Sequence, residues 1–232
     1  MSSLGGIIMI DRKLKKHLLE AAKYYPVVAV LGPRQSGKTT LARATFPHHK
    51  YINFEDVIGV QDYIKRDPKG FLEEHRNEHG IIIDEFQHAP IILSYLQLAA
   101  DEEKRLGYFI LAGSQNFLMN EAITQTLAGR IGILTLLPLS ISELKQANLL
   151  PQNSEDALYK GFYPRLFFNE QDPNNFYKNY LRTYIERDVR QLKNVGDLSK
   201  FQTFMQLCAG RIGQTIVLSS LAQDCGITVV TA

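Results

Sequence analysis

Eight consecutive residues, from Gly32 to Thr39, have types and spacing suited to binding phosphate. They read Gly-Pro-Arg-Gln-Ser-Gly-Lys-Thr and fit the pattern G-x-x-x-x-G-K-[ST]. An apolar run leads into this glycine turn and a helix is expected to open at about Gly37, so that backbone N–H groups face one point. Lys38 adds a full charge for β- and γ-phosphates, and the glycines let the backbone approach them. We call these residues the phosphate loop and expect a nucleoside triphosphate to bind to Gly32, Pro33, Arg34, Gln35, Ser36, Gly37, Lys38 and Thr39.

Two adjacent carboxylates, Asp84 and Glu85, follow three isoleucines and indicate the catalytic half of such a site. Side chains at the carboxyl end of a parallel strand lie where α/β sheets bind ligands. We expect the Thr39 hydroxyl to ligate Mg²⁺ and Asp84 to order the ion through its water shell. Glu85 is expected to polarise the water that attacks the γ-phosphorus. A base for water favours a hydrolase over a small-molecule kinase.

Polar residues follow the next apolar run, in Gly113-Ser114-Gln115. Gln115 or Ser114 can sense the γ-phosphate or the attacking water if this run lies beside the phosphate-loop strand. The alternative is a polar turn without a catalytic role.

Arg130 is a candidate arginine finger, since a guanidinium that reaches the γ-phosphate raises the rate by roughly 10³–10⁵. The sequence leaves three possibilities open for it. Arg130 acts within its own chain, acts across an oligomer interface, or forms a surface ion pair.

Alternating strands and helices must position these residues. Short apolar runs predict five strands, at residues 26–31, 51–54, 81–85, 108–112 and 131–137. Helices are expected between them, at residues 37–44, 57–65, 68–78, 90–105 and 117–127. This alternation is typical of an α/β fold with a parallel sheet.

The first residues of the chain carry a basic amphipathic pattern. Residues 1–9 are expected to be a loose start, and Asp11 is a good N-cap for a helix to about Tyr24. One face of this helix is apolar and consists of Leu14, Leu18, Leu19 and Ala22. Its basic cluster is either a solvated face or a ligand contact and consists of Arg12, Lys13, Lys15 and Lys16.

Beyond Pro138 the pattern predicts helices only. Ser140 and Glu143 have the spacing of a capping box, and residues 151–154 resemble a linker. Helices are expected at residues 172–192, 198–209 and 219–225. The last of these, followed by Gly226, resembles the first helix and turn of a helix-turn-helix. We expect an N-terminal helix at 1–25, a phosphate-loop domain at 26–150 and a helical region at 151–232.

Composition narrows the class of protein. The chain has 232 residues, 45% of them hydrophobic, and a net charge of +2, which does not by itself call for nucleic acid. Cys208 and Cys225 match no zinc or redox spacing, and no apolar run approaches the length of a membrane span. We expect a cytoplasmic protein without membrane contact.

Taken together, the motifs resemble those of the prokaryotic AAA-type P-loop ATPases that carry a C-terminal conserved domain of unknown function. The resemblance covers about residues 11–226 and includes GPRQSGKTTLAR, IIIDEFQHAP, YFILAGSQNF, TLAGRIGILTLLPLSISEL, GFYPR and YLRTYIERDVRQL. It implies an ASCE-type three-layer sheet with the sensor strand between the phosphate-loop and carboxylate strands, followed by a helical region with winged-helix character. It also implies ATP as the nucleotide, Thr40 as a further binding residue and Gln115 as the sensor.

The resemblance also implies a longer chain, because that family usually continues well beyond the position of Ala232. We therefore expect a truncated C-terminal region. The expected function is a slow, Mg²⁺-dependent ATPase or ATP-driven switch, with Glu85, Lys38, Gln115 and Arg130 as catalytic residues. The alternative is an ATP-regulated nucleic-acid-binding module, and a small-molecule kinase is less favoured. Expected partners are the nucleotide, a second copy of the chain, and DNA or a protein through the C-terminal region.

Overall fold

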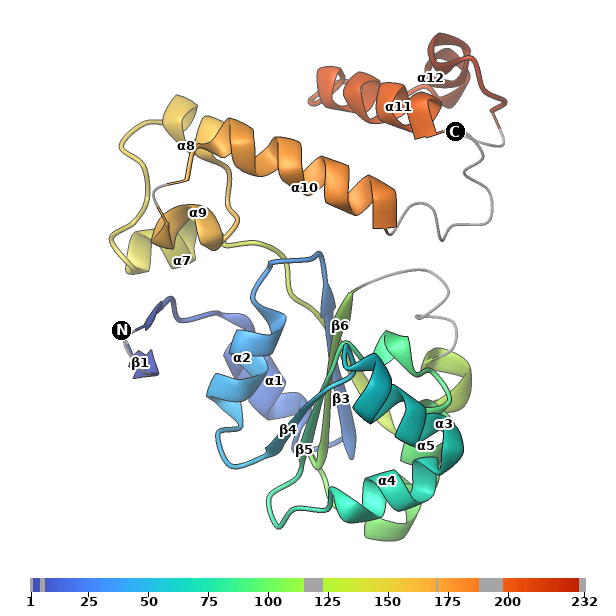
Figure 1. Cartoon of the computed structure of the whole chain (residues 1–232). Coiled ribbons are helices and arrows are strands. Elements are labelled where there is room, and N and C mark those ends of the chain that lie inside the picture. The colour runs from blue at the N-terminus through green and yellow to red at the C-terminus, as the bar shows by residue number, and fades with distance from the viewer. Residues whose placement is uncertain (1, 5–6, 115–122, 170, 188–197, 230–232) are drawn as a thin grey trace. The chain divides into compact units, whose positions relative to one another are not determined.

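The chain folds as two compact units, Met1–Glu170 and Gln171–Ala232. A computed structural model describes residues 2–4, 7–114, 123–169, 171–187 and 198–229 (Figure 1). The first unit extends to residue 170, and Leu139 and Leu144 share an apolar core with Ile10 of the N-terminal segment.

A five-stranded parallel sheet forms the centre of the first unit. Its order is β4-β5-β6-β3-β7. The strands are β3 (Val27–Gly32), β4 (Lys50–Asn53), β5 (Ile81–Asp84), β6 (Phe109–Ser114) and β7 (Ile131–Thr135). The central strand β3 is buried along its whole length, as expected for a parallel strand covered on both faces. Because β6 lies between β3 and β5, the expected ASCE arrangement is confirmed.

Strand register brings the polar strand ends to one edge. Gly32 at the end of β3 pairs with Ser114 of β6, and Asp84 at the end of β5 pairs with Ala112. The phosphate loop, the carboxylates and the end of β6 therefore share the carboxyl edge of the sheet.

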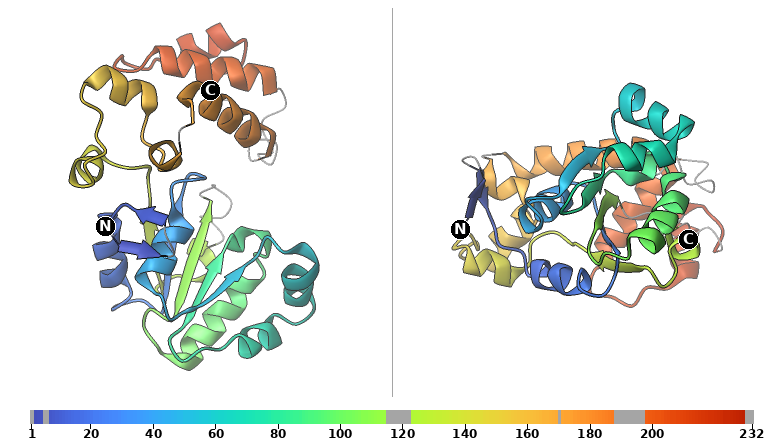
Figure 2. Two further views of the ribbon diagram at one scale, coloured as in Figure 1. Left: turned by 60° about the vertical axis from the view of Figure 1, so that its left-hand side comes forward. Right: turned by 90° about the horizontal axis from the view of Figure 1, so that it is seen from below.

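Helices cover both faces of the sheet, which makes the fold three-layered (Figures 1 and 2). One face packs against α1 (Leu14–Ala21) and α2 (Lys38–Thr45). The other packs against η1 (Val57–Gln61), α3 (Asp62–Arg66), α4 (Pro68–Glu74), η2 (Phe86–His88) and α5 (Ile92–Glu103). Side chains of β3 alternate between the two layers, with Val28 and Val30 on the first face and Val27, Ala29 and Leu31 on the second.

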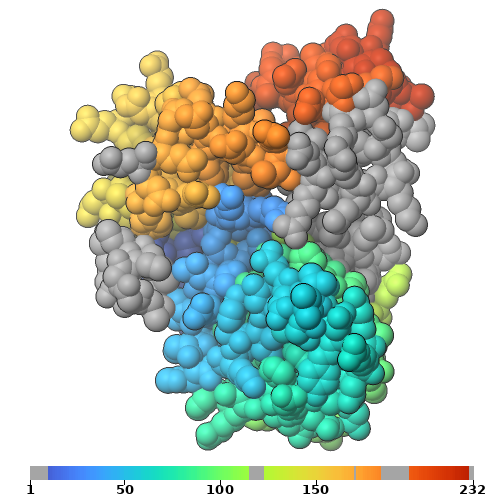
Figure 3. Space-filling view, viewed as in Figure 1, coloured from blue at the N-terminus to red at the C-terminus, as the bar shows by residue number. Residues whose placement is uncertain are grey.

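The segment between β4 and β5, in cyan to green, forms much of the lower part of the first unit's near face in the space-filling view (Figure 3). Asp67 caps α4 by accepting a hydrogen bond from the backbone N–H of Gly70, and Pro68 occupies the first turn as the sequence predicted. Apolar residues of this segment, among them Ile64 and Phe71, close over the sheet.

The N-terminal segment differs from the prediction in two ways. Residues expected to be loose form a hairpin of β1 (Ser2–Leu4) and β2 (Ile7–Met9). Helix α1 begins at Leu14 without a side-chain cap, so Asp11 is not its N-cap. The reason is that the backbone N–H of Lys13 donates to Glu143 instead. Leu18 is fully buried as expected, whereas Leu19 is 42% exposed.

Three short helices complete the first unit. They are α7 (Ile141–Gln146), α8 (Ser154–Lys160) and α9 (Arg165–Phe168). The capping box of Ser140 and Glu143 is present at the start of α7. Ile10 from the N-terminal segment is buried with Leu139 and Leu144, which ties α7 to the beginning of the chain.

The second unit is helical, as the sequence predicted. It contains α10 (Pro173–Arg187), α11 (Leu198–Gly210) and α12 (Leu218–Cys225). Helix α11 packs against α12, and Gly226 ends α12 in the left-handed conformation. Winged-helix character remains a prediction. Among the residues that the structure describes, no helix is long and apolar enough to cross a membrane.

Candidate nucleotide-binding site

The phosphate loop joins β3 to α2 and has the features of an anion site. Helix α2 begins after Gly37, which adopts φ 94°, and no side chain of the described residues caps it. The N–H groups of its first turn therefore lack intrahelical acceptors and can bind an anion. Ser36 is fully buried, and its hydroxyl has no hydrogen-bond partner in the described part of the chain. Gln35 and Thr40 are exposed, and Pro33 and Arg34 are half-buried.

The two glycines of the phosphate loop are required for different reasons. A Cβ on Gly32 would lie 2.2 Å from the backbone oxygen of Leu136, just after β7. Gly32 is therefore needed for close packing between neighbouring segments, in addition to the expected access for phosphate. Gly37 is needed for its positive φ, which a residue with a side chain rarely adopts.

Lys38 is held inside the phosphate loop. Its side chain is buried, and its Nζ donates to the backbone oxygens of Gly32, at 3.1 Å, and Pro33, at 2.8 Å. These carbonyl groups are strong acceptors for an ammonium group and place its charge within the turn. The charge thus lies where a triphosphate would meet the N-terminus of α2.

A shared carboxylate oxygen connects the phosphate loop with β5. Oδ2 of Asp84 accepts hydrogen bonds from the Thr39 hydroxyl, at 2.8 Å, and from the Tyr51 hydroxyl of β4, at 2.9 Å. Asp84 is 4% exposed. Burial is the largest cause that raises the pKa of Tyr51, and the charge of Asp84 and its hydrogen bond raise it further. The Tyr51 hydroxyl therefore keeps its proton and acts as a donor. The sequence predicted Thr39 and Asp84 but missed Tyr51, because its proximity depends on strand register.

Glu85 lies immediately beyond β5 in an uncommon backbone conformation. Its φ is 52°, in the left-handed region that few residues other than glycine adopt. Its carboxylate accepts a hydrogen bond from Nε2 of Gln87 in η2. The sequence predicted Glu85 as the base but gave Gln87 no role. An amide two residues after a carboxylate is close enough in sequence to have suggested this contact.

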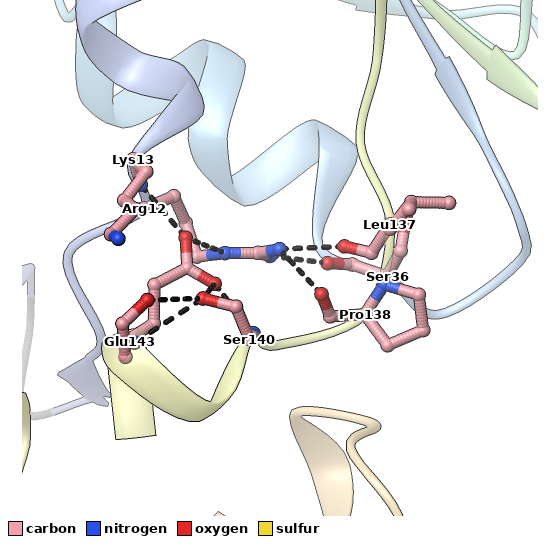
Figure 4. A network of polar contacts seen from close by, with 8 residues as sticks. Arg12, Lys13, Ser36, Leu137, Pro138, Ser140 and Glu143 are labelled. Atoms are coloured by element: carbon pink, nitrogen blue, oxygen red, sulfur yellow. Dashed lines mark hydrogen bonds and ion pairs between the residues drawn. The ribbon is translucent and has the colours of Figure 1, made fainter. Parts of the chain in front are cut away.

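Arg12, predicted as part of a basic cluster, instead braces the phosphate loop (Figure 4). Its Nη1 donates to the backbone oxygen of Ser36 at 2.7 Å. Its Nη2 donates to the backbone oxygens of Leu137, at 2.6 Å, and Pro138, at 3.2 Å. Because a trans peptide is planar, fixing the Ser36 carbonyl also directs the Gly37 N–H the opposite way.

Glu143 neutralises this guanidinium and caps α7 at the same time. Its Oε1 accepts from Nε of Arg12 at 3.2 Å, and the two side chains are 6% and 9% exposed, respectively. Its Oε2 accepts from the backbone N–H of Ser140 at 2.8 Å. Burial alone would raise the pKa of Glu143, but the backbone donors Ser140 and Lys13 and the charge of Arg12 outweigh it and lower the pKa.

Of the other predicted residues, Ser114 lies at the carboxyl edge, where it pairs with Gly32, and Arg130 does not. Arg130 precedes β7, and its carbonyl accepts from the N–H of Val27 where β3 begins, at the opposite edge of the sheet. Its Nε and Nη2 contact the carboxylate of Asp101 at 2.6 and 2.9 Å, and the hydrogen bond lowers the pKa of Asp101. This placement corresponds to the surface ion pair, not to a finger within the same chain. Gln115 lies outside the described residues.

The sheet order and the phosphate loop define a P-loop nucleotide-binding protein of the ASCE type. A family model for the AAA domain matches residues 24–145, more than half of the chain, and the chain belongs to this family. A second model, for a domain of unknown function (DUF8612), matches residues 151–232. Both matches confirm the resemblance found in the sequence, and an AAA domain implies nucleotide binding.

The chain is similar to two curated relatives in sequence and to a solved structure in fold. Uncharacterised proteins of Mycobacterium bovis and Mycobacterium tuberculosis are each 28% identical over 190 residues, which is 80% of this chain. The chain spans 41% of the length of these relatives. The solved structure of the Walker-type ATPase PABY2304 of Pyrococcus abyssi is similar with a TM-score of 0.55 and 18% identity, covering 94% of this chain and 89% of that one.

The residues at the carboxyl edge also fit Mg²⁺ as a companion of the nucleotide. Mg²⁺ is usually bound by one or two protein oxygens together with phosphates and water. The hydroxyl of Thr39 and the carboxylate of Asp84 already lie side by side at 2.8 Å. In the described residues no cluster of three or more histidine, cysteine or acidic side chains could hold a metal.

Proposed function

We propose that this chain binds Mg·ATP at the phosphate loop and hydrolyses it slowly, as an AAA-type ATPase or an ATP-driven switch. The observation that carries the proposal is the contact between Thr39 and Asp84, which joins the end of β5 to the start of α2. A phosphate loop alone would serve any nucleotide-binding protein. Its connection to a carboxylate pair supports a site that activates water.

The side chains have separate roles in this proposal. Lys38 and the first-turn N–H groups of α2 bind the β- and γ-phosphates. Thr39 and Asp84 hold Mg²⁺, which supplies charge neutralisation on the phosphates when it is bound. Glu85 accepts a proton from the attacking water. Arg12 supports the loop from outside by holding the Ser36 carbonyl.

Two substitutions test the proposal. Lys38→Ala should weaken ATP binding at least about tenfold, because a hydrogen bond to a charged group contributes about 1.5–3 kcal/mol. Glu85→Gln should leave ATP binding within about threefold and slow phosphate release by about 100-fold or more. Binding is measured with a fluorescent ATP analogue, and turnover by phosphate release.

The matched controls are Lys69→Ala on α4 and Glu102→Gln on α5, both exposed. They should change neither quantity more than about twofold, as is usual for surface substitutions. If Glu85→Gln releases phosphate at the wild-type rate, Glu85 is not the base. Transfer of labelled γ-phosphate to a metabolite in place of water would support the kinase alternative.

A further inference from the structure

We propose that Gln87 is a positioning residue for hydrolysis, holding Glu85 with its amide N–H and the attacking water with its amide oxygen. The inference rests on the proposed function, because it assigns a partner to the proposed base. Gln87 belongs to η2, the single turn that follows β5, and its neighbour Phe86 is fully buried. The burial of Phe86 therefore anchors η2 in the core at the residue that follows Glu85.

The orientation of the Gln87 amide follows from its neighbour. An ionised carboxylate only accepts hydrogen bonds, so the group facing Oε2 of Glu85 must be the NH₂ of Gln87. The amide oxygen then points the other way. That oxygen is buried, and no donor in the described part of the chain reaches it. A buried acceptor without a donor costs about 1–3 kcal/mol, so a ligand that supplies one is favoured here.

The position of this oxygen relates it to the phosphate loop. A Cβ on Gly113 would lie 2.6 Å from Oε1 of Gln87, so the amide oxygen rests against the backbone of β6 at that residue. Gly113 pairs with Leu31 of β3, and the preceding residue Ala112 pairs with Asp84. The oxygen thus lies at the carboxyl edge, against β6, which is the strand between the phosphate-loop strand β3 and the carboxylate strand β5. The Ser114 hydroxyl, at the end of the same strand, is also buried without a partner among the described residues.

Water matches this pair of groups because it has two O–H bonds to donate. One would point to Glu85 and the other to Oε1 of Gln87, leaving an oxygen lone pair for the γ-phosphorus. In the step, the water oxygen bonds to the γ-phosphorus while the bond from that phosphorus to the bridging oxygen of ADP breaks. One water proton passes to Glu85, and the other O–H remains on the product phosphate. Gln87 itself gains and loses no proton.

The experiment separates positioning from structural support. Gln87→Met keeps the length of the side chain and removes both amide groups, and Gln87→Glu keeps the acceptor but removes the donor. Each should lower kcat by about 10–100-fold while KM and the dissociation constant for the fluorescent ATP analogue stay within about threefold. The matched control Gln97→Met, on α5, should have less than about a twofold effect.

A double substitution tests whether Gln87 acts through Glu85. If Gln87 works through Glu85, adding Gln87→Met to Glu85→Gln should slow single-turnover hydrolysis by less than about threefold. Wild-type kcat in Gln87→Met, or equal losses of kcat and ATP affinity, would overturn the role of Gln87 even where Glu85→Gln is inactive. Unchanged hydrolysis in Glu85→Gln would instead overturn the proposed function, so the two failures are distinguishable.

Discussion

Individual side chains at this site serve two elements at once, and Glu143 is the clearest example. Oε2 caps α7, while Oε1 neutralises the arginine that holds the phosphate loop. A buried arginine whose partner is removed becomes an uncompensated charge. The stability of the first unit and the shape of the phosphate loop therefore depend on the same carboxylate.

Glu143→Gln isolates the charge, because glutamine also serves in a capping box. It should lower the free energy of unfolding by about 3 kcal/mol near pH 7, the usual loss for a broken buried ion pair. The pKa of Glu143 is lowered from 4.5 in the folded state, so its contribution is present above that value and is lost as the pH falls through the folded pKa. Urea unfolding of wild type and variant should thus converge in acid.

The control for this measurement is Glu102→Gln, which alters an exposed carboxylate on α5. Its unfolding curve should follow that of the wild type at each pH. A difference between wild type and Glu143→Gln that stays constant from neutral to acid pH would contradict the role of the ionised carboxylate.

Residue spacing predicted the phosphate loop and Asp84-Glu85, because these groups are local in sequence, and their roles stay predictions. Tyr51, Gln87 and Arg12 were not predicted in their roles. Tyr51 reaches Asp84 only through the register of β4 and β5, and Arg12 reaches Glu143 across 131 residues. Contacts of this kind leave no periodic signal in one sequence.

At the scale of elements, the end of β6 and the turn η2 are packed without spare room. Gly113→Ala would place a methyl group 2.6 Å from Oε1 of Gln87 and 2.7 Å from the ring of Phe86. The glutamine can move, but the buried ring cannot. We expect a loss of about 1–3 kcal/mol in stability, as for other overpacked cores, together with slower hydrolysis because Gln87 is displaced. Thermal unfolding and phosphate release measure the two effects.

Gly210→Ala, at the end of α11, is the control for Gly113→Ala. Apart from its chain neighbours and the backbone of its own helix, no atom of the described residues lies within 4 Å of the added methyl group there. It should be neutral or slightly stabilising, since alanine is favoured over glycine in helices. If Gly113→Ala kept wild-type stability and turnover, η2 would be able to move aside without cost, which would contradict this prediction.

The strands of the parallel sheet were predicted accurately, and the start of α1 was not. The five predicted strands of the parallel sheet were found, because continuous apolar runs are needed where both faces are covered. The start of α1 was wrong, since the backbone of Lys13 is bound by a residue far along the chain. The hairpin β1-β2 was missed, and its strands are only three residues each.

At the scale of the whole molecule, the position of Arg130 bears on whether ATP turnover requires a second copy of the chain. Its bidentate contact with Asp101 uses the guanidinium at the edge opposite the phosphate loop. We expect Arg130→Gln to change ATP turnover less than about twofold, and turnover per chain to be independent of protein concentration. Phosphate release over a range of concentrations, with and without DNA, measures this.

A rate that rises with concentration and is lost in Arg130→Gln would restore the arginine finger across an interface. Stimulation by DNA that weakens with salt would support the nucleic-acid alternative, since salt dependence reports phosphate contacts.

The central place of β3 has a consequence for how the protein is made. Both of its neighbours, β6 and β7, come later in the chain, and so does Glu143, which anchors Arg12. A ribosome adding 5–20 residues per second needs on the order of ten seconds to reach them after β3 is complete. During that interval the apolar run of β3 has no strand to pair with. The phosphate loop, although encoded early, therefore cannot reach its final form until β6, β7 and Glu143 have been made.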